Sequence, residues 1–230
     1  MTSARLRHRK RGLASLLAGG VALLTLTGCG MAHPGVAVQI GNTSISRDEV
    51  NTITRIQCDL VKRQQGGTAQ ARTKMAQATV NILIESAVDN LYGASVGATY
   101  DGSVLRAAVQ QFRTNVATLA PKDQDAIVKA FTDYQRGQLM LKTVGEQKLM
   151  QQGQKSPAVT QAVNEGHMLA TAWATKLDIQ IDPRYSPGRS NQAGGGDGSI
   201  SRSVSAYAKS AAGATSPSFV AALPSGLRCG

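Results

Sequence analysis

The chain has 230 residues, which is enough for one domain of ordinary size and short for two. Its formal charge of +11 comes mainly from the two ends: residues 1–12 hold five basic and no acidic side chains, and residues 183–230 hold five basic and one acidic. Between them, residues 31–182 carry 15 basic and 13 acidic side chains, so their net charge is only +2. Nucleic-acid binding would call for a basic face on the folded body, so we expect no nucleic-acid partner.

Residues 1–28 are typical of a lipoprotein signal peptide. The basic start is followed by an uncharged apolar stretch over 12–27, shorter than the roughly 20 residues of a membrane-spanning helix. The stretch runs into Leu-Thr-Gly-Cys at 26–29, which resembles the bacterial lipobox. We expect cleavage before Cys29, palmitate or a similar lipid on Cys29, and anchoring to the extracytoplasmic face of the cell membrane through a tether over 29–35. The alternative is an ordinary cleaved signal with an incidental cysteine.

Two further cysteines, Cys58 and Cys229, remain in the exported chain. One remaining pair in an oxidising compartment favours a disulfide. The chain that follows the folded body has about 46 residues and is long enough for Cys229 to reach Cys58. Closing so long a loop would contribute roughly 5 kcal/mol in the chain-entropy treatment. Two unpaired thiols, or pairing with another chain, are the alternatives.

The body opens with an expected strand and an expected helix. Residues 36–40 alternate apolar and β-branched side chains, and the Gly-Asn pair that follows indicates a turn. Ser46 and Glu49 have the spacing of a capping box, in which the serine oxygen and the glutamate each bind a free backbone N–H. They predict a helix over 47–65.

Four more helices are expected over 69–96, 101–119, 121–152 and 156–177, from apolar residues that recur every three or four positions. Gly137 and Gly145 weaken the fourth of them by about 1 kcal/mol each. The fifth is the most regular, with an expected core-facing stripe of Val159, Val163, Gly166, Ala170, Trp173 and Leu177.

Residues 178–181 return to a strand pattern that Pro183 ends. Because isolated strands leave backbone groups unpaired, we expect this strand to pair with residues 36–40. The predicted fold is mostly α: about five helices over 36–185, closed by two short paired strands. Gly, Ser, Ala and Pro make up 30 of the 48 residues from 183 onward, so residues 186–230 are expected to form a flexible tail.

The remaining residues do not indicate an enzyme. His33 lies near the expected anchor, and His167 lies beside the apolar face of the fifth helix, where a packed histidine is commoner than a ligand. Metal-binding spacing, a phosphate-binding loop and a serine-nucleophile elbow are not found. The acidic pairs at 48–49 and 123–125 fall at helix starts, where carboxylates stabilise the helix dipole. We therefore expect no catalytic residue, no cofactor and no bound metal.

Three features together suggest a family. They are the lipobox at Cys29, the strand, turn and helix over 36–50, and a closing strand that ends in Asp-Pro-Arg-Tyr at 182–185. In this order they resemble the actinobacterial lipoproteins that carry a SurA-like N-terminal chaperone domain. The resemblance covers about residues 26–201. It implies a SurA-like helical domain over 36–185.

The resemblance also implies a function. It indicates a membrane-anchored holdase that binds unfolded or partly folded exported proteins, with client-binding residues that the sequence does not identify. Some relatives add a parvulin-like prolyl isomerase module, but nothing similar follows residue 185, so isomerase activity is not implied. The alternative is a structural or interaction lipoprotein that holds one dedicated cell-envelope partner without general chaperone activity.

Overall fold

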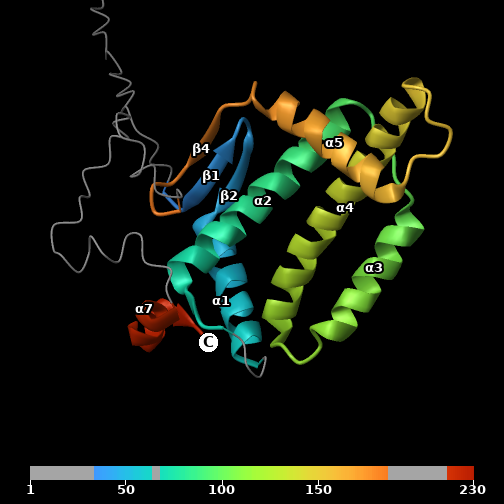
Figure 1. The fold of residues 1–230 in the computed structure, drawn as a ribbon. Helices are drawn as coiled ribbons and strands as arrows, with labels where there is room; N and C mark the ends of the chain where they lie inside the picture. Colours follow the sequence, from blue (N-terminus) through green and yellow to red (C-terminus); the bar gives the residue numbers. More distant parts are fainter. Residues whose placement is uncertain (1–33, 64–67, 186–216) are drawn as a thin grey trace, which may run out of the picture. The chain divides into compact units, whose positions relative to one another are not determined.

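The computed structural model describes residues 34–63, 68–185 and 217–230, all of which fall in one unit over 31–230. The expected signal peptide, the lipidation site Cys29 and His33 lie outside the described residues. Within the described part the fold is mostly α, as predicted (Figure 1). Its main helices are α1 (Arg47–Arg63), α2 (Arg72–Ser95), α3 (Gly102–Asn115), α4 (Pro121–Gln151) and α5 (Val159–Ala174). None of the helices in these ranges is long and apolar enough to cross a membrane.

The two predicted strands pair and close the domain. Strand β1 (Val36–Ile40) lies between β2 (Thr43–Ser46) and β4 (Ile179–Ile181) in an antiparallel sheet of order β2-β1-β4. Val38 faces Ile181 across the β1–β4 ladder, and Ile40 faces Ile179. The backbone segments that open and end the domain are therefore hydrogen-bonded to each other. The sheet packs on α1 and α2 around a core of Ala37, Val38, Ile40, Ile45, Val50, Val80 and Tyr185.

Helix starts follow local capping rules in part. The Oγ of Ser46 accepts the backbone N–H of Glu49 at 3.0 Å, as predicted. The Glu49 carboxylate, however, binds Nζ of Lys129 at 3.1 Å. Asp101 caps α3 by accepting the N–H of Ser103 at 2.7 Å. Helix α2 begins three residues later than predicted, because residues 70–71 form the short strand β3 (Gln70–Ala71).

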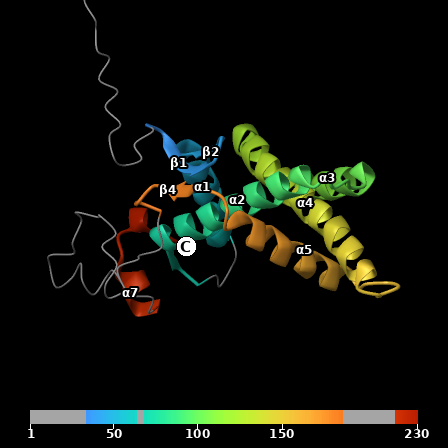
Figure 2. The same ribbon diagram turned by 90° about the horizontal axis from the view of Figure 1, so that it is seen from above.

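Helices α4 and α5 cross at a contact made by small residues. Figures 1 and 2 show α5 lying across the C-terminal half of α4. At Gly145 an added Cβ would overlap the carbonyl oxygen of Ala162, and at Gly166 it would overlap that of Leu141. Two backbones can approach this closely only where side chains are absent. Gly145 therefore serves packing between helices, which outweighs its low helix propensity.

This crossing corrects the face predicted for α5. The helix begins at Val159 and not at residues 156–157, and the Val159 side chain is 58% exposed. The buried residues of α5 are Ala162, Gly166 and Ala170. The predicted stripe is wrong at its first position because α5 approaches α4 through small side chains, so large apolar residues do not define the contact.

The C-terminal end is also more ordered than predicted. The expected flexible tail over 186–230 is wrong for its last part, where α7 (Pro217–Ala222), a 3₁₀ turn η2 (Ser225–Leu227) and β5 (Arg228–Cys229) form. Strand β5 pairs antiparallel with β3, and Cys229 is bonded to Cys58 of α1, with 4.5 Å between their Cα atoms. The ordering follows from this attachment, since Cys229 is completely buried. Residues 186–216 lie outside the described residues.

We predict that Gly166→Ala lowers the free energy of unfolding by more than about 2 kcal/mol, because the new methyl group overlaps the backbone of α4. Urea unfolding followed by circular dichroism measures the change. Gly102→Ala is the matched control: its Cβ would meet only the flexible end of Arg106, at 3.3 Å, and alanine favours the helix. Equal stability of Gly166→Ala and the parent chain would contradict the close crossing.

We predict that replacing both bonded cysteines by alanine lowers the free energy of unfolding by about 2–5 kcal/mol, because the bond closes a loop of 171 residues. It should also make the last 14 residues more accessible to proteases, since the hydrogen bonds between β5 and β3 span only two residues of each strand. Non-reducing thiol alkylation with mass spectrometry checks the bond in the parent chain. Two free thiols there would contradict it.

Candidate functional site

A groove runs between α2 and α4. It consists of two adjoining cavities that share Leu83, Ser86 and Ala130 in their walls. The larger has a volume of about 280 Å³ and lies among β2, α1, α2 and α4. The smaller has a volume of about 140 Å³ and lies among α1, α2, α3 and α4. We call the two together the α2–α4 groove.

The smaller cavity presents an apolar surface. Its large apolar lining residues come from four helices: Ile53, Ile82, Leu83, Phe112, Ile127, Phe131 and Tyr134. The polar side chains beside them bind one another, since the Oγ1 of Thr79 donates to Oε1 of Gln57 at 2.7 Å. Ile82 remains 44% exposed at the wall. An apolar group that enters this cavity would therefore meet a mostly hydrocarbon surface.

Helix α3 forms one wall of the groove through its contact with α4. The rings of Phe112 and Phe131 stack with centroids 4.0 Å apart. Leu105 is the one buried side chain within α3, and Val104 is 49% exposed. The contacts of α3 with α4 outweigh those with other elements. Because few buried groups hold it, α3 belongs to the less stable part of the described fold.

Asn90 supplies an unusual polar group to the larger cavity. Its Nδ2 donates to the carbonyl oxygens of Ser86 and Asp133, at 2.7 Å each. Its Oδ1 is buried and has no hydrogen-bond partner in the described part of the chain. A buried acceptor without a partner is destabilising by about 1–3 kcal/mol. The unpaired acceptor is thus enclosed within the groove wall, and the two hydrogen bonds of Nδ2 hold the Asn90 side chain in place.

The rim of the larger cavity carries charges of both signs. Lys129 binds Glu49 at 3.1 Å and Asp133 at 3.2 Å, and Arg136 binds Asp133 at 3.0 Å. The contact of Lys129 with Glu49 connects α4 with α1, whereas the other two lie within α4. The ionisable groups of this rim are thus bound to one another and give it no single sign of charge.

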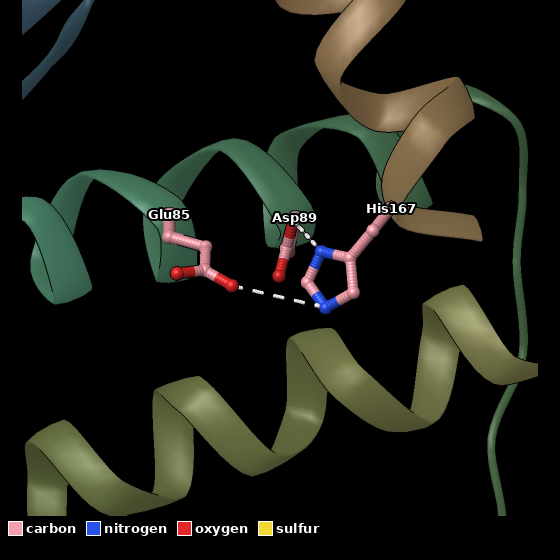
Figure 3. Close-up of side chains that lie close together, drawn as sticks. All are labelled: Glu85, Asp89 and His167. Atoms are coloured by element: carbon pink, nitrogen blue, oxygen red, sulfur yellow. Dashed lines mark ion pairs between the residues drawn. The ribbon is translucent and has the colours of Figure 1, made fainter. Parts of the chain in front are cut away.

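A second polar cluster lies on the other side of α2. Figure 3 shows Glu85 and Asp89 of α2 pointing toward His167 of α5. The Glu85 Oε1 lies 3.8 Å from Nε2 of the ring, and the Asp89 Oδ1 lies 3.7 Å from Nδ1. Gln138 of α4 contacts both partners, with its Nε2 3.3 Å from Asp89 Oδ2 and 2.9 Å from His167 Nε2. The cluster borders a cavity of about 280 Å³ among α2, α5 and β4.

Asp89 is the buried member of this cluster, with an exposed fraction of only 2%. Burial raises the pKa of its carboxyl group to about 7, the charge of Glu85 adds to the increase, and the hydrogen bond from Gln138 opposes it. The carboxyl group of Asp89 thus changes charge near neutral pH, unlike an ordinary aspartate.

The structure places the other residues singled out in the sequence as follows. Cys58 and Cys229 are bonded to each other. Asp123, expected to stabilise a helix start, also pairs with Arg55 of α1, whose hydrogen bonds lower the pKa of the Asp123 carboxyl group. Trp173 is half-buried, with its ring centroid 5.7 Å from that of Tyr92. His167 faces two carboxylates, which its position beside an apolar face did not indicate.

The sequence contains one signal for this cluster, the spacing of Glu85 and Asp89 by four residues on one helix face. His167 lies 78 positions further along the chain than Asp89, so only the packing of α5 beside α2 brings the three together. The groove likewise combines residues of four helices and has no short sequence signature.

We predict that Asp89→Asn removes a pH dependence from stability. Because the folded pKa is raised, the contribution of Asp89 is fully present below about pH 4 and is lost as pH rises toward 7. In metal-free buffer the free energy of unfolding of the parent chain should therefore fall relative to that of the variant as pH rises from 4 to 8. The fall should be at most about 4 kcal/mol. Urea unfolding of both proteins across this range measures the difference. A difference that does not change with pH would show that Asp89 titrates normally.

Comparison of the chain with models of protein families, with curated proteins and with solved structures finds no match. Any function must therefore be argued from the groove and the cluster themselves.

Proposed function

We propose that this protein is a membrane-anchored extracytoplasmic holdase that binds unfolded exported polypeptides in the α2–α4 groove. The observation that carries the proposal is the apolar lining of the smaller cavity, with Ile82 44% exposed at its wall. An extended, unfolded peptide exposes apolar side chains along its length. One of these side chains would enter the smaller cavity while the chain lies along the groove.

The composition of the rim supports broad client selection. A rim of one sign would select clients of the opposite charge. Here Glu49 and Asp133 alternate with Lys129 and Arg136, so oppositely charged clients are treated alike. The apolar cavity recognises apolar side chains, a feature that every unfolded chain shares. The ionisable rim groups are held in ion pairs, an arrangement suited to a binding surface and not to proton transfer.

Anchoring through a lipid on Cys29 completes the proposal. It would hold the groove near the membrane at which exported chains emerge unfolded. A second acyl chain or a basic segment makes such anchoring stable, since each buried methylene contributes about 0.8 kcal/mol.

We predict that the chain from Gly30 onward suppresses aggregation of several unrelated, chemically unfolded exported proteins at near-stoichiometric ratios. Light scattering against chaperone concentration measures the effect. Ile82→Glu should require several-fold more protein for equal suppression, because it places a charge at the apolar cavity wall. Val159→Glu is the matched control, since Val159 is a more exposed β-branched residue at the start of α5.

Two results would count against the proposal. Suppression by Ile82→Glu equal to that of the parent chain would remove the groove as the binding site. No suppression of any client would rule out a general holdase. It would favour the alternative of one dedicated envelope partner, which cross-linking from Ile82 in intact cells would then identify.

A further inference from the structure

We propose that Glu85, Asp89 and His167 form a binding site for a divalent first-row transition metal ion, with zinc as the best fit. The site lies between α2 and α5 and does not involve the α2–α4 groove, so it is independent of the proposed function. Three observations carry it: the geometry of the three side chains, a buried aspartate with one oxygen that accepts no hydrogen bond, and an adjoining cavity.

The three side chains lie close together and come from two helices, with Glu85 beside Nε2 of the ring and Asp89 beside Nδ1 (Figure 3). One ligand atom from each lies within 4.8 Å of the others. Tetrahedral zinc, with bonds of about 2.0–2.2 Å, holds its ligand atoms roughly 3.4 Å apart. The Asp89 Oδ1 is already 3.7 Å from Nδ1 of His167. Glu85 is about half exposed and can rotate to close the remaining gap.

The Oδ1 of Asp89 indicates that a positive charge is missing. The residue is 2% exposed, and among the described residues this oxygen accepts no hydrogen bond. In the same ranges neither Glu85 nor Asp89 forms an ion pair with lysine or arginine; His167 is their one cationic candidate. Two carboxylates this close, one of them buried, repel each other when both are ionised, and a cation between them removes that repulsion. A divalent ion would supply that charge.

Gln138 is placed to orient the ligands. Both ends of its amide lie near Nε2 of His167, with its Nε2 at 2.9 Å and its Oε1 at 3.2 Å, and its Nε2 also donates to Oδ2 of Asp89 at 3.3 Å. A metal ion on Nδ1 requires the tautomer with a proton on Nε2, in which the ring donates to Oε1 of Gln138 and the lone pair of Nδ1 is free beside Asp89. Ligand histidines in metal sites characteristically donate their other ring N–H in this way. We therefore assign Nδ1 as the ligating nitrogen.

The ligand set and the cavity indicate which ion would bind. An imidazole with two carboxylates suits zinc and its first-row neighbours, whereas calcium and magnesium prefer oxygen ligands alone. Three protein ligands leave one tetrahedral position open. That position would face the adjoining cavity of about 280 Å³, which Asn81 and Thr171 also line. Water or a small ligand would complete the coordination there.

Binding should be measured with zinc chloride on the full chain, purified in mild detergent and stripped of metal with EDTA. Isothermal titration should give one equivalent of Zn²⁺ per chain, and differential scanning fluorimetry should show a higher melting temperature, because zinc binds the folded state and joins α2 to α5. Substitution by Co²⁺ should produce the intense visible absorption of a tetrahedral site. No zinc binding by the parent chain would overturn the proposal.

Variants separate this site from other zinc ligands in the chain. His167→Gln should abolish both the binding of one Zn²⁺ per chain and the rise in melting temperature that zinc causes. Glu85 is half exposed, so its position tolerates change. Glu85→Gln should weaken zinc affinity by at least roughly 10- to 100-fold, which is the loss expected when a residue that only orients a metal ligand is removed. Asp125→Asn, with the same charge change on an exposed residue of α4, should bind like the parent. Zinc that still binds His167→Gln with parental affinity would be held elsewhere in the chain and would overturn the assignment.

Discussion

The antiparallel pairing of β1 with β4 is the constraint on which the rest of the domain depends. It hydrogen-bonds the strand that opens the domain to β4, which follows the five main helices. Asp182 completes this closure: its N–H donates to Ala37 at 2.8 Å, and its carboxylate accepts Nε of Arg47 at 2.7 Å and the N–H of Arg184 at 3.0 Å. With 6% exposure, this carboxylate is buried and fully partnered. The Asp-Pro-Arg-Tyr motif therefore has a structural explanation independent of any family resemblance.

The close crossing of α4 and α5 determines where the side chains of α5 lie. Gly145 and Gly166 let the backbones of α4 and α5 come into contact. Because α5 therefore lies close to α4 and α2, His167 reaches Gln138 on α4 and Asp89 on α2. A larger residue at either glycine would move the ring away from the carboxylates. The packing of apolar and small residues thus creates the polar cluster.

Helix α2 connects the two candidate sites without merging them. Leu83 and Ser86 face the α2–α4 groove, while Glu85 and Asp89 face α5. A helix contacted on several sides has buried residues around much of its circumference, which is why α2 shows buried polar as well as apolar side chains. Binding at either site would act on the same rigid element. The disulfide between α1 and β5 adds a covalent link at the end of the domain near β3.

Much of the fold follows from the sequence alone. Apolar spacing predicted the five main helices, β-branched alternation predicted the paired strands, and Ser46 and Asp101 marked helix starts, because each of these signals acts over a few residues. Only the tertiary structure decided the position of the groove and the hydrogen bond from Asn90 to Asp133. The same holds for the close crossing of α4 and α5 at Gly145 and Gly166, and for the cluster of His167 with Glu85 and Asp89. The tertiary structure also decided that the last residues are ordered, since their composition predicts flexibility whereas a bond to Cys58 holds them. The physical reason is the same in each case: these features depend on contacts between segments far apart in the chain, and local patterns carry no information about such contacts.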